Sequence, residues 1–329
     1  MNNNREQQVF QKEGDLRIYL QVSGQWYYYD PNSVPLGNGA MGTVYLGFSC
    51  NSNKRIAVKR VKDIYANNRM IRERARQEAS LSFSHPYLVQ MIGLCEYAPN
   101  YGPIFILSEY VAGITLDAHV REQLNGLPVA ERTEKVATEI CHVLDALQYL
   151  HLRGVVHRDV KPSNIMIENG SVIKLMDLGI ARLNGGNKYS SFGFIGTPQY
   201  AAPEQILRDT RNAEINAQTD VYAVGVTLYE LLTGNNPFKT DIEAEILSRQ
   251  MTMKLPYDKK IPRSLYRVIL KATEKSQAKR YKSALELKEA ITDAIYKKNN
   301  PVSDVLLNNK IVISCVLLLL VLLIISFLI

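Results

Sequence analysis

"VVHRDVKPSN", residues 155–164, brings five different polar side chains together directly after two valines. In this stretch Asp159 could accept the proton of an attacking hydroxyl, and Lys161 could neutralise a phosphoryl group during transfer. Asn164 could offer its amide oxygen to a metal ion, and Arg158 could bind a phosphate carried elsewhere on the chain. Phosphoryl transfer depends on positioning, metal ions and neutralised charge rather than on covalent help from the protein. The stretch therefore predicts a phosphoryl-transfer site.

Two further stretches supply charged groups that suit the same chemistry. KLMDLG adds Asp177, a second hard oxygen ligand for Mg²⁺. IAVKR places Lys59 on a predicted strand between apolar neighbours. A lysine that points into a protein needs a carboxylate or a polyphosphate beside it, because an unpaired buried charge is costly. Glu78 is the candidate carboxylate, and Glu73 is the alternative.

The stretch LGNGAMGTVY, residues 36–45, carries Gly37, Gly39 and Gly42 in GxGxxGxV spacing. Glycines let the backbone approach phosphates without a Cβ clash. The next residues are β-branched and apolar and predict a strand, whereas a dinucleotide-binding motif opens a helix at this point. The pattern favours a flap over phosphates, and a plain glycine-rich hairpin is the alternative.

Composition narrows the class of protein. The chain has 329 residues, 46% of them hydrophobic, and a net charge of +7. Its lysines and arginines are spread along the sequence, which indicates a solvated surface, and we expect no nucleic-acid partner. The four cysteines lie far apart, without a CxxC pair or a histidine at metal-ligand spacing. This pattern argues against a disulfide framework and a structural zinc site.

The predicted secondary structure changes along the chain. Strand patterns dominate the first third, and long helical patterns such as EKVATEICHVLDALQYLHLRG dominate from about residue 116. Strands followed by helices predict an α+β molecule with two unequal lobes and a cleft between them. The stretch LRIYLQVSGQWYYY, residues 16–29, alternates about a central Ser-Gly and predicts a hairpin. The expected parts are an N-terminal extension at 1–30, a catalytic domain at 31–297 that divides at 112–113, a juxtamembrane linker at 298–310 and a membrane span at 311–329.

Residues 311–329, IVISCVLLLLVLLIISFLI, contain no charge. As a helix this segment would be roughly 28 Å long, about the hydrocarbon thickness of a bilayer. Lys297, Lys298 and Lys310 precede it and suit a cytoplasmic flank. The polar N-terminus shows no secretory signal. We expect a single-pass membrane protein with a C-terminal anchor and a cytoplasmic catalytic domain, and a buried soluble helix is the alternative.

The motifs GxGxxGxV, AVK, HRDxKPxN, DLG and APE occur in one order between about Val34 and Lys297. In this order they resemble the eukaryotic-like Ser/Thr protein kinases of bacterial type. The resemblance implies an α+β bilobal protein kinase fold, with a small β-rich N-lobe, a larger α-helical C-lobe and, here, one C-terminal transmembrane helix. It also implies transfer of the γ-phosphoryl group of ATP to Ser or Thr hydroxyls of proteins, with Mg²⁺ as the metal and Mn²⁺ as an alternative.

The resemblance assigns a role to individual residues. The catalytic residues it implies are Asp159, Lys161, Lys59 and Glu78, with Asn164 and Asp177 as metal ligands and Thr197 in a substrate-binding loop. The ATP-binding residues it implies are Leu36, Gly37, Asn38, Gly39, Ala40, Gly42, Val44, Ala57, Lys59, Ser108, Glu109, Val111 and Met166. Ser108 is the implied gatekeeper at the back of the adenine pocket, and Glu109 and Val111 are the implied hinge. Asp220 would brace the catalytic loop, and Arg280 would pair with Glu204.

The sequence departs from the family pattern at two places. DLG replaces the commoner DFG, although Leu178 still offers an apolar side chain. Glu78 lies seven residues before His85, two fewer than the family spacing, so the helix or its following loop must be shorter. Glu73 therefore stays the alternative partner of Lys59.

In the segment 180–196, IARLNGGNKYSSFGFIG, Gly185, Gly186 and Gly193 favour flexibility. Ser190 and Ser191 lie where this family is often phosphorylated, which predicts autophosphorylation. The alternative is that both serines are only polar loop residues.

Two other functions fit parts of the pattern. A pseudokinase that scaffolds partners at a membrane is disfavoured, because Lys59, Asp159, Asn164 and Asp177 are all present. A small-molecule phosphotransferase of the aminoglycoside type is disfavoured by GTPQYAAPE, which resembles a peptide-binding loop. We expect protein substrates and a membrane as partners, and the sequence leaves homodimer formation open.

Overall fold

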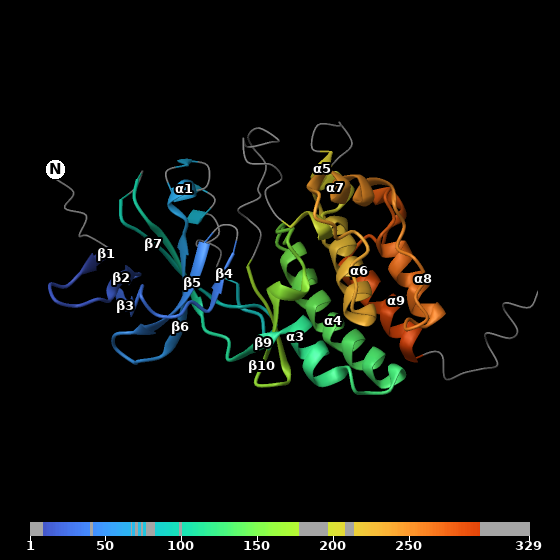
Figure 1. The fold of residues 1–329 in the computed structure, drawn as a ribbon, viewed down its shortest axis with the longest axis horizontal. Coiled ribbons are helices and arrows are strands. Elements are labelled where there is room, and N and C mark those ends of the chain that lie inside the picture. The colour runs from blue at the N-terminus through green and yellow to red at the C-terminus, as the bar shows by residue number, and fades with distance from the viewer. Residues whose placement is uncertain are drawn as a thin grey trace, which may run out of the picture.

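The computed structural model describes residues 9–39, 42–66, 68–69, 72–73, 75–76, 83–98, 101–177, 197–207 and 214–296. These residues form two lobes, one built on a β-sheet and one on helices, joined between β8 and β9 (Figure 1). The predicted division of the fold into a β-rich N-lobe and a helical C-lobe is confirmed.

The N-lobe holds one antiparallel sheet with strand order β1-β2-β3-β5-β6-β8-β7, and β4 pairs with β5. Its elements are β1 (Val9–Gln11), β2 (Ile18–Val22), β3 (Gln25–Tyr29), β4 (Gly37–Asn38), β5 (Gly42–Ser49), β6 (Arg55–Val61), α1 (Asp63–Ala66), β7 (Met91–Glu96) and β8 (Ile104–Glu109).

The predicted hairpin at 16–29 is present as β2 and β3. Ser23 and Gly24 connect the two strands with positive φ angles of 50° and 77°, and such turns match the twist of antiparallel strands. Alternation places Leu20 and Tyr29 in the hydrophobic core of the lobe. Because β3 pairs with β5, the sheet begins ahead of residue 31, and the strands of the predicted extension are part of it.

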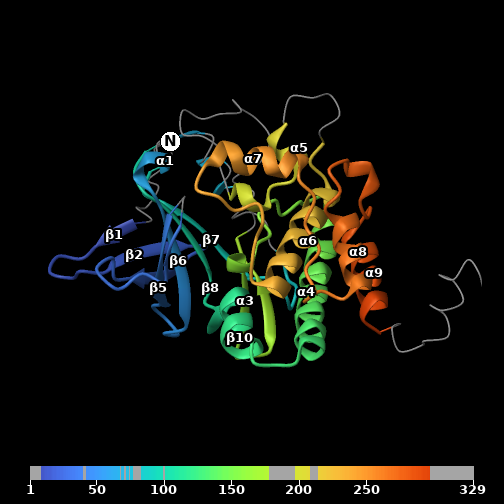
Figure 2. The same ribbon diagram turned by 45° about the vertical axis from the view of Figure 1, so that its right-hand side comes forward.

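The C-lobe begins with a small sheet of order β11-β10-β9 and continues into a helical bundle (Figure 2). Its helices and strands are β9 (Gly113–Thr115), α3 (Leu116–His119), a π-helix (Val120–Leu124), α4 (Val129–His151), β10 (Ile165–Glu168), β11 (Val172–Leu175), α5 (Pro203–Ile206), α6 (Ala217–Thr233), α7 (Glu243–Thr252), α8 (Arg263–Ala272) and α9 (Ala284–Tyr296). Short 3₁₀ turns lie at Pro162–Asn164, Pro198–Tyr200 and Gln277–Lys279.

Helix α6 runs through the centre of the C-lobe, and nearly all of its side chains are buried. It is mostly apolar and buried on nearly every side, which is typical of a helix surrounded by other elements. The side chain of Asn216 accepts a hydrogen bond from the amide of Gln218 at the N-cap, and Gly234 ends the helix in the left-handed conformation with φ 78°. The start of this helix carries Asp220 toward the catalytic loop.

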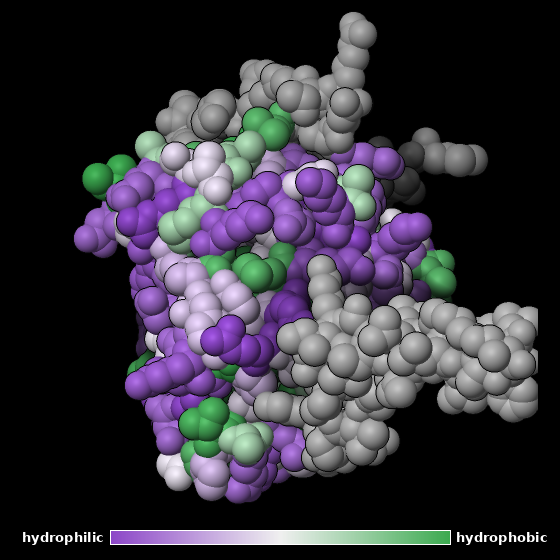
Figure 3. All heavy atoms as spheres, turned by 90° about the vertical axis from the view of Figure 1, so that its right-hand side faces the viewer, coloured by the Kyte–Doolittle hydropathy of each residue, from purple (hydrophilic) through white to green (hydrophobic). Residues whose placement is uncertain are grey.

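The end of the C-lobe that faces the viewer in Figure 3 is mostly hydrophilic, with hydrophobic side chains scattered over it. The predicted linker at 298–310 and membrane span at 311–329 lie outside the described residues. Among the helices that the structure describes, none is long and apolar enough to cross a bilayer.

Candidate functional site

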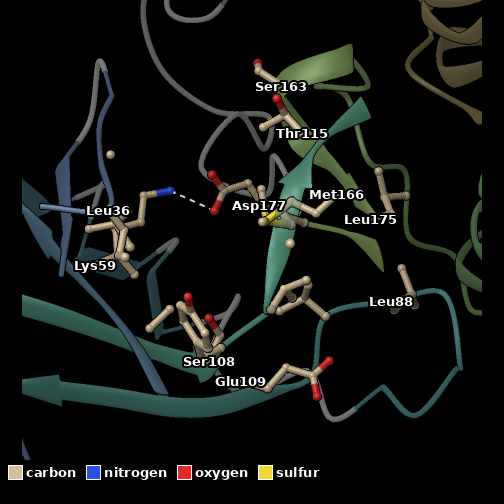
Figure 4. A pocket seen from close by; sticks show the side chains of 18 of the residues that line it. Leu36, Lys59, Leu88, Ser108, Glu109, Thr115, Ser163, Met166, Leu175 and Asp177 are labelled. Atoms are coloured by element: carbon tan, nitrogen blue, oxygen red, sulfur yellow. Dashed lines mark hydrogen bonds and ion pairs between the residues drawn. The ribbon is translucent and has the colours of Figure 1, made fainter. Parts of the chain in front are cut away.

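A cavity of about 520 Å³ lies between the two lobes (Figure 4). The predicted ligand-binding residues that line it are Leu36, Gly37, Val44, Ala57, Lys59, Ser108, Glu109, Val111, Met166 and Asp177. Asn38, Gly39 and Gly42 belong to the β4–β5 hairpin above the cavity without lining it, and Ala40 lies outside the described residues. Three stretches of the sequence, at 36–59, 108–111 and 166–177, thus contribute to one binding pocket.

Several lining residues were not predicted. Met91 and Ile106 line the cavity near Ser108, and Phe83 and Leu88 extend its apolar wall. The alternation of β8 could have indicated Ile106, because it shares a face with Ser108. Leu88 gave no such signal, because its bridge to Leu175 and its packing into the C-lobe core depend on the tertiary fold.

The hinge residue Glu109 is fixed by three bonds. Its amide donates to the carbonyl of Gln90 at 2.9 Å, and its carboxylate accepts from the amide of Gln90 at 3.1 Å. The carboxylate also pairs with Lys174 Nζ on β11 at 3.0 Å. This ion pair joins the last residue of β8 to the C-lobe, so Glu109 fixes the end of this strand at the wall of the cavity.

Lys59 extends from β6 across the cavity to Asp177, with 3.0 Å between Nζ and Oδ1. Attraction to the Lys59 ammonium is the main cause that lowers the pKa of Asp177. Glu78, the predicted partner of Lys59, lies outside the described residues. The alternative, Glu73, pairs with Arg76 at 3.3 Å. The ion pair that the structure describes for Lys59 was therefore not predicted, and it joins the two lobes across the pocket.

The catalytic loop brings four predicted residues into contact. Asp159 Oδ2 accepts a hydrogen bond from Asn164 Nδ2 at 3.1 Å and forms an ion pair with Lys161 Nζ at 3.2 Å. Lys161 Nζ also donates to Thr197 Oγ1 at 2.6 Å. A carboxylate, an ammonium and a hydroxyl from two separate segments therefore share one hydrogen-bonded cluster. Such a cluster can orient a hydroxyl and neutralise charge that develops on it.

Asn164 and Asp177 are suited to hold Mg²⁺ together with a polyphosphate. The amide nitrogen of Asn164 is engaged by Asp159, which leaves its oxygen as the atom that could bind a metal. The amide of Met176 donates to the carbonyl of Asn164 at 2.8 Å and so sets Asp177 beside it. One carboxylate, one amide oxygen and phosphate oxygens form the kind of ligand set that Mg²⁺ accepts.

His157 connects the catalytic loop to the segment that carries Asp177. It is fully buried, and burial lowers its pKa, so the ring is neutral. Its Nδ1 accepts from the amide of Asp159 at 3.3 Å, and its Nε2 therefore donates to the carbonyl of Met176 at 2.9 Å. A neutral imidazole with this tautomer fixes the spacing between the two functional segments.

Asp220 holds the catalytic loop by hydrogen bonds to its backbone. Its carboxylate accepts from the amides of His157 at 2.8 Å and Arg158 at 2.7 Å, and it pairs with His151 Nε2 at 2.7 Å. Burial alone would raise the pKa of Asp220, but these hydrogen bonds and charges lower it overall. The bonds hold Arg158 at a φ of 68°, a costly conformation for a residue with a side chain. Asp177 has a φ of 50°, so both strained residues belong to the site.

Glu204 and Arg280 form a buried ion pair with distances of 2.7 and 2.8 Å. The family resemblance implied this pair, and the structure contains it. Thr219 also donates to Glu204 at 2.8 Å. The pair therefore fixes α5, which follows the predicted substrate-binding loop, to the C-lobe core.

Comparison with known proteins gives a consistent result. A protein kinase domain model matches residues 32–291. Serine/threonine-protein kinase PknB of Mycobacterium tuberculosis (strain H37Rv) is 34% identical over 263 residues, which cover 77% of this chain and 41% of that protein. Serine/threonine-protein kinase PrkC of Bacillus subtilis (strain 168) is 32% identical over 266 residues, which cover 79% and 39%. The matched region spans about two fifths of the length of these relatives.

The solved structures agree with this comparison. The crystal structure of the Mycobacterium tuberculosis PknI kinase domain superposes with a TM-score of 0.60 at 26% identity. The superposition covers 82% of this chain and 96% of that one.

Proposed function

The chain belongs to the protein kinase family, as a serine/threonine protein kinase of bacterial type, and from this premise we propose that it phosphorylates Ser and Thr hydroxyls of other proteins with ATP. The observation that carries the proposal is the cluster of Asp159, Lys161, Asn164 and Thr197 beside the interlobe cavity. The cluster contains the groups that phosphoryl transfer requires, and both lobes contribute to the adjacent pocket.

The cavity would hold ATP with its adenine ring between apolar side chains of both lobes. Ala57 and Val44 line the N-lobe side, and Met166 lines the C-lobe side. Lys59 would bind the phosphates. In the structure its ammonium pairs with another anion, the carboxylate of Asp177. When bound with the nucleotide, Mg²⁺ neutralises phosphate charge, and Asn164 and Asp177 would hold it.

Asp159 would orient the attacking hydroxyl and accept its proton. Its carboxylate is already directed by Asn164 and Lys161. Lys161 would stabilise charge on the moving phosphoryl group, and its bond to Thr197 places the substrate-binding segment next to that charge. Fixed donors and cations of this kind need no reorganisation during the reaction.

Membrane anchoring and autophosphorylation are finer parts of the proposal. The uncharged segment 311–329 would span a membrane once, with the kinase domain on the cytoplasmic side. Ser190 and Ser191 would accept phosphate within the segment 180–196. Arg158 would pair with that phosphate, because it lies in the catalytic loop. A guanidinium group can form a bidentate pair with phosphate.

Asp159→Asn tests the proposal in the full-length protein purified in detergent. The exchange preserves shape but removes the base, so phosphorylation of casein should fall by roughly 10²-fold or more. Asp241→Asn, at an exposed position, serves as the control and should retain full activity. Near-native turnover by an Asp159→Asn protein with an unchanged unfolding temperature would contradict the assigned role. If the protein were a pseudokinase scaffold, the native protein itself would not phosphorylate casein.

A further inference from the structure

Helix α7 places a completely buried glutamine against the substrate-binding segment. Gln250 has no exposed surface, and its amide nitrogen donates to the carbonyl of Gln199 at 2.6 Å and to that of Pro198 at 3.2 Å. These two carbonyls belong to the turn that directly follows Thr197. One side chain therefore binds the backbone of the segment that contacts Lys161.

The other end of this amide is bound as firmly. Gln250 Oε1 accepts the hydroxyl proton of Tyr222, a fully buried residue of α6. Burial raises the pKa of Tyr222, so the hydroxyl keeps its proton and remains a donor. Lys275 Nζ donates to the same hydroxyl at 2.8 Å and lies 4.7 Å from the ring centre of Phe238. The amide of Gln250 is thus held in one orientation.

This orientation has a direct consequence for the segment 197–200. Both donor bonds of Gln250 go to the backbone carbonyls of Pro198 and Gln199, so these two carbonyls have a hydrogen-bond partner where the turn packs against α7. On its other side, Tyr200 OH donates to Glu230 at 2.6 Å. The segment is therefore bound through its backbone by α7 and through its side chain by α6.

We propose that Gln250 is a positioning residue that sets the peptide-binding segment 197–200 against the catalytic loop, with Tyr222 and Lys275 fixing its amide. The inference rests on the proposed kinase function. It assigns a role in protein-substrate recognition, and not in nucleotide binding, to Gln250, Tyr222 and Lys275. Gln250 is absent from the nucleotide cavity wall among the described residues. Replacing Gln250 should therefore raise the KM for the protein substrate and leave the KM for ATP unchanged.

Gln250→Glu in the full-length protein is the principal test. The carboxylate keeps the shape and still accepts from Tyr222, but it cannot donate to the two carbonyls and repels them. The KM for casein should rise about tenfold, equivalent to about 1.4 kcal/mol, while the KM for ATP stays unchanged. Ser248→Ala, an exposed position on the same helix, is the control and should change neither constant.

The acidic variant also provides a pH readout that a purely structural role would not produce. A buried carboxyl titrates at raised pH and regains a donor when it is protonated. Lowering the pH from about 8 to about 6 should therefore reduce the casein KM of Gln250→Glu relative to that of the native protein. Tyr222→Phe removes only the orienting hydroxyl and should raise the casein KM in the same direction by a smaller factor.

The outcomes separate the two proposals. If the native protein does not phosphorylate casein, the proposed function fails. If it does, an unchanged casein KM in both Gln250→Glu and Tyr222→Phe overturns the positioning role. Equal changes in the casein and ATP constants would also overturn it, because they would indicate general damage to the C-lobe.

Discussion

Replacing Ser108 with methionine should abolish the binding of bulky purine-like inhibitors and leave ATP binding intact. Ser108 lines the interlobe cavity next to Met91 and Ile106. Two larger neighbours could have closed the space behind it, but Leu107 and Ile92 pack into the core on the opposite face of the sheet. Because Ser108 is small and these two neighbours face away, we expect room for a bulky group at the back of the cavity.

The size of the effect follows from the surface that an inhibitor would bury there. An aromatic group placed behind the adenine position would lose contact with water and gain about 1.5–3 kcal/mol, or roughly ten- to a hundredfold in affinity. The longer side chain in Ser108→Met would occupy this space. ATP itself has no group that reaches it, so its binding should change little.

Inhibition constants for one N6-benzyl purine analogue, measured on native protein, Ser108→Met and Ser108→Ala, test the reasoning. Ser108→Ala removes the hydroxyl without adding bulk and should bind the analogue as the native protein does. Equal inhibition constants for native protein and Ser108→Met would refute the reasoning, because the cavity would then be closed behind Ser108 or the side chain would point elsewhere.

Three further predictions concern anchoring, regulation and stability. Deleting residues 305–329 should yield a soluble active kinase, and release of the full-length protein by carbonate extraction of membranes would contradict the anchor. Mass spectrometry of active protein should find phosphate on Ser190 or Ser191, and full activity of a Ser190→Ala/Ser191→Ala variant would exclude its regulatory role. Burial lowers the pKa of Lys275 from 10.5 to about 7. Between these values the unfolded chain binds a proton that the folded chain lacks, so the free energy of unfolding should rise with pH in this window. Lys275→Met should flatten that rise in urea unfolding, and an unaltered slope would argue against the burial of its amine.

The sequence alone predicted the features that depend on neighbouring residues. The hairpin at 16–29 follows from alternation and from Ser23-Gly24, which favour a tight turn. The close approach of Asp159, Lys161 and Asn164 follows from their spacing within one loop. These are local properties, because backbone preference and side-chain period act over a few residues.

The tertiary structure alone decided three contacts between distant groups that neither local pattern nor family resemblance indicated. Lys59 pairs with Asp177, Glu109 pairs with Lys174, and Gln250 binds the backbone beyond Thr197. No local pattern marks these partners, since each pair joins elements whose packing depends on the whole hydrophobic core. A buried polar group must find its partner within that packing, because leaving it unpaired costs more than a hydrogen bond contributes. The fold therefore selected these contacts from the many that the sequence permits.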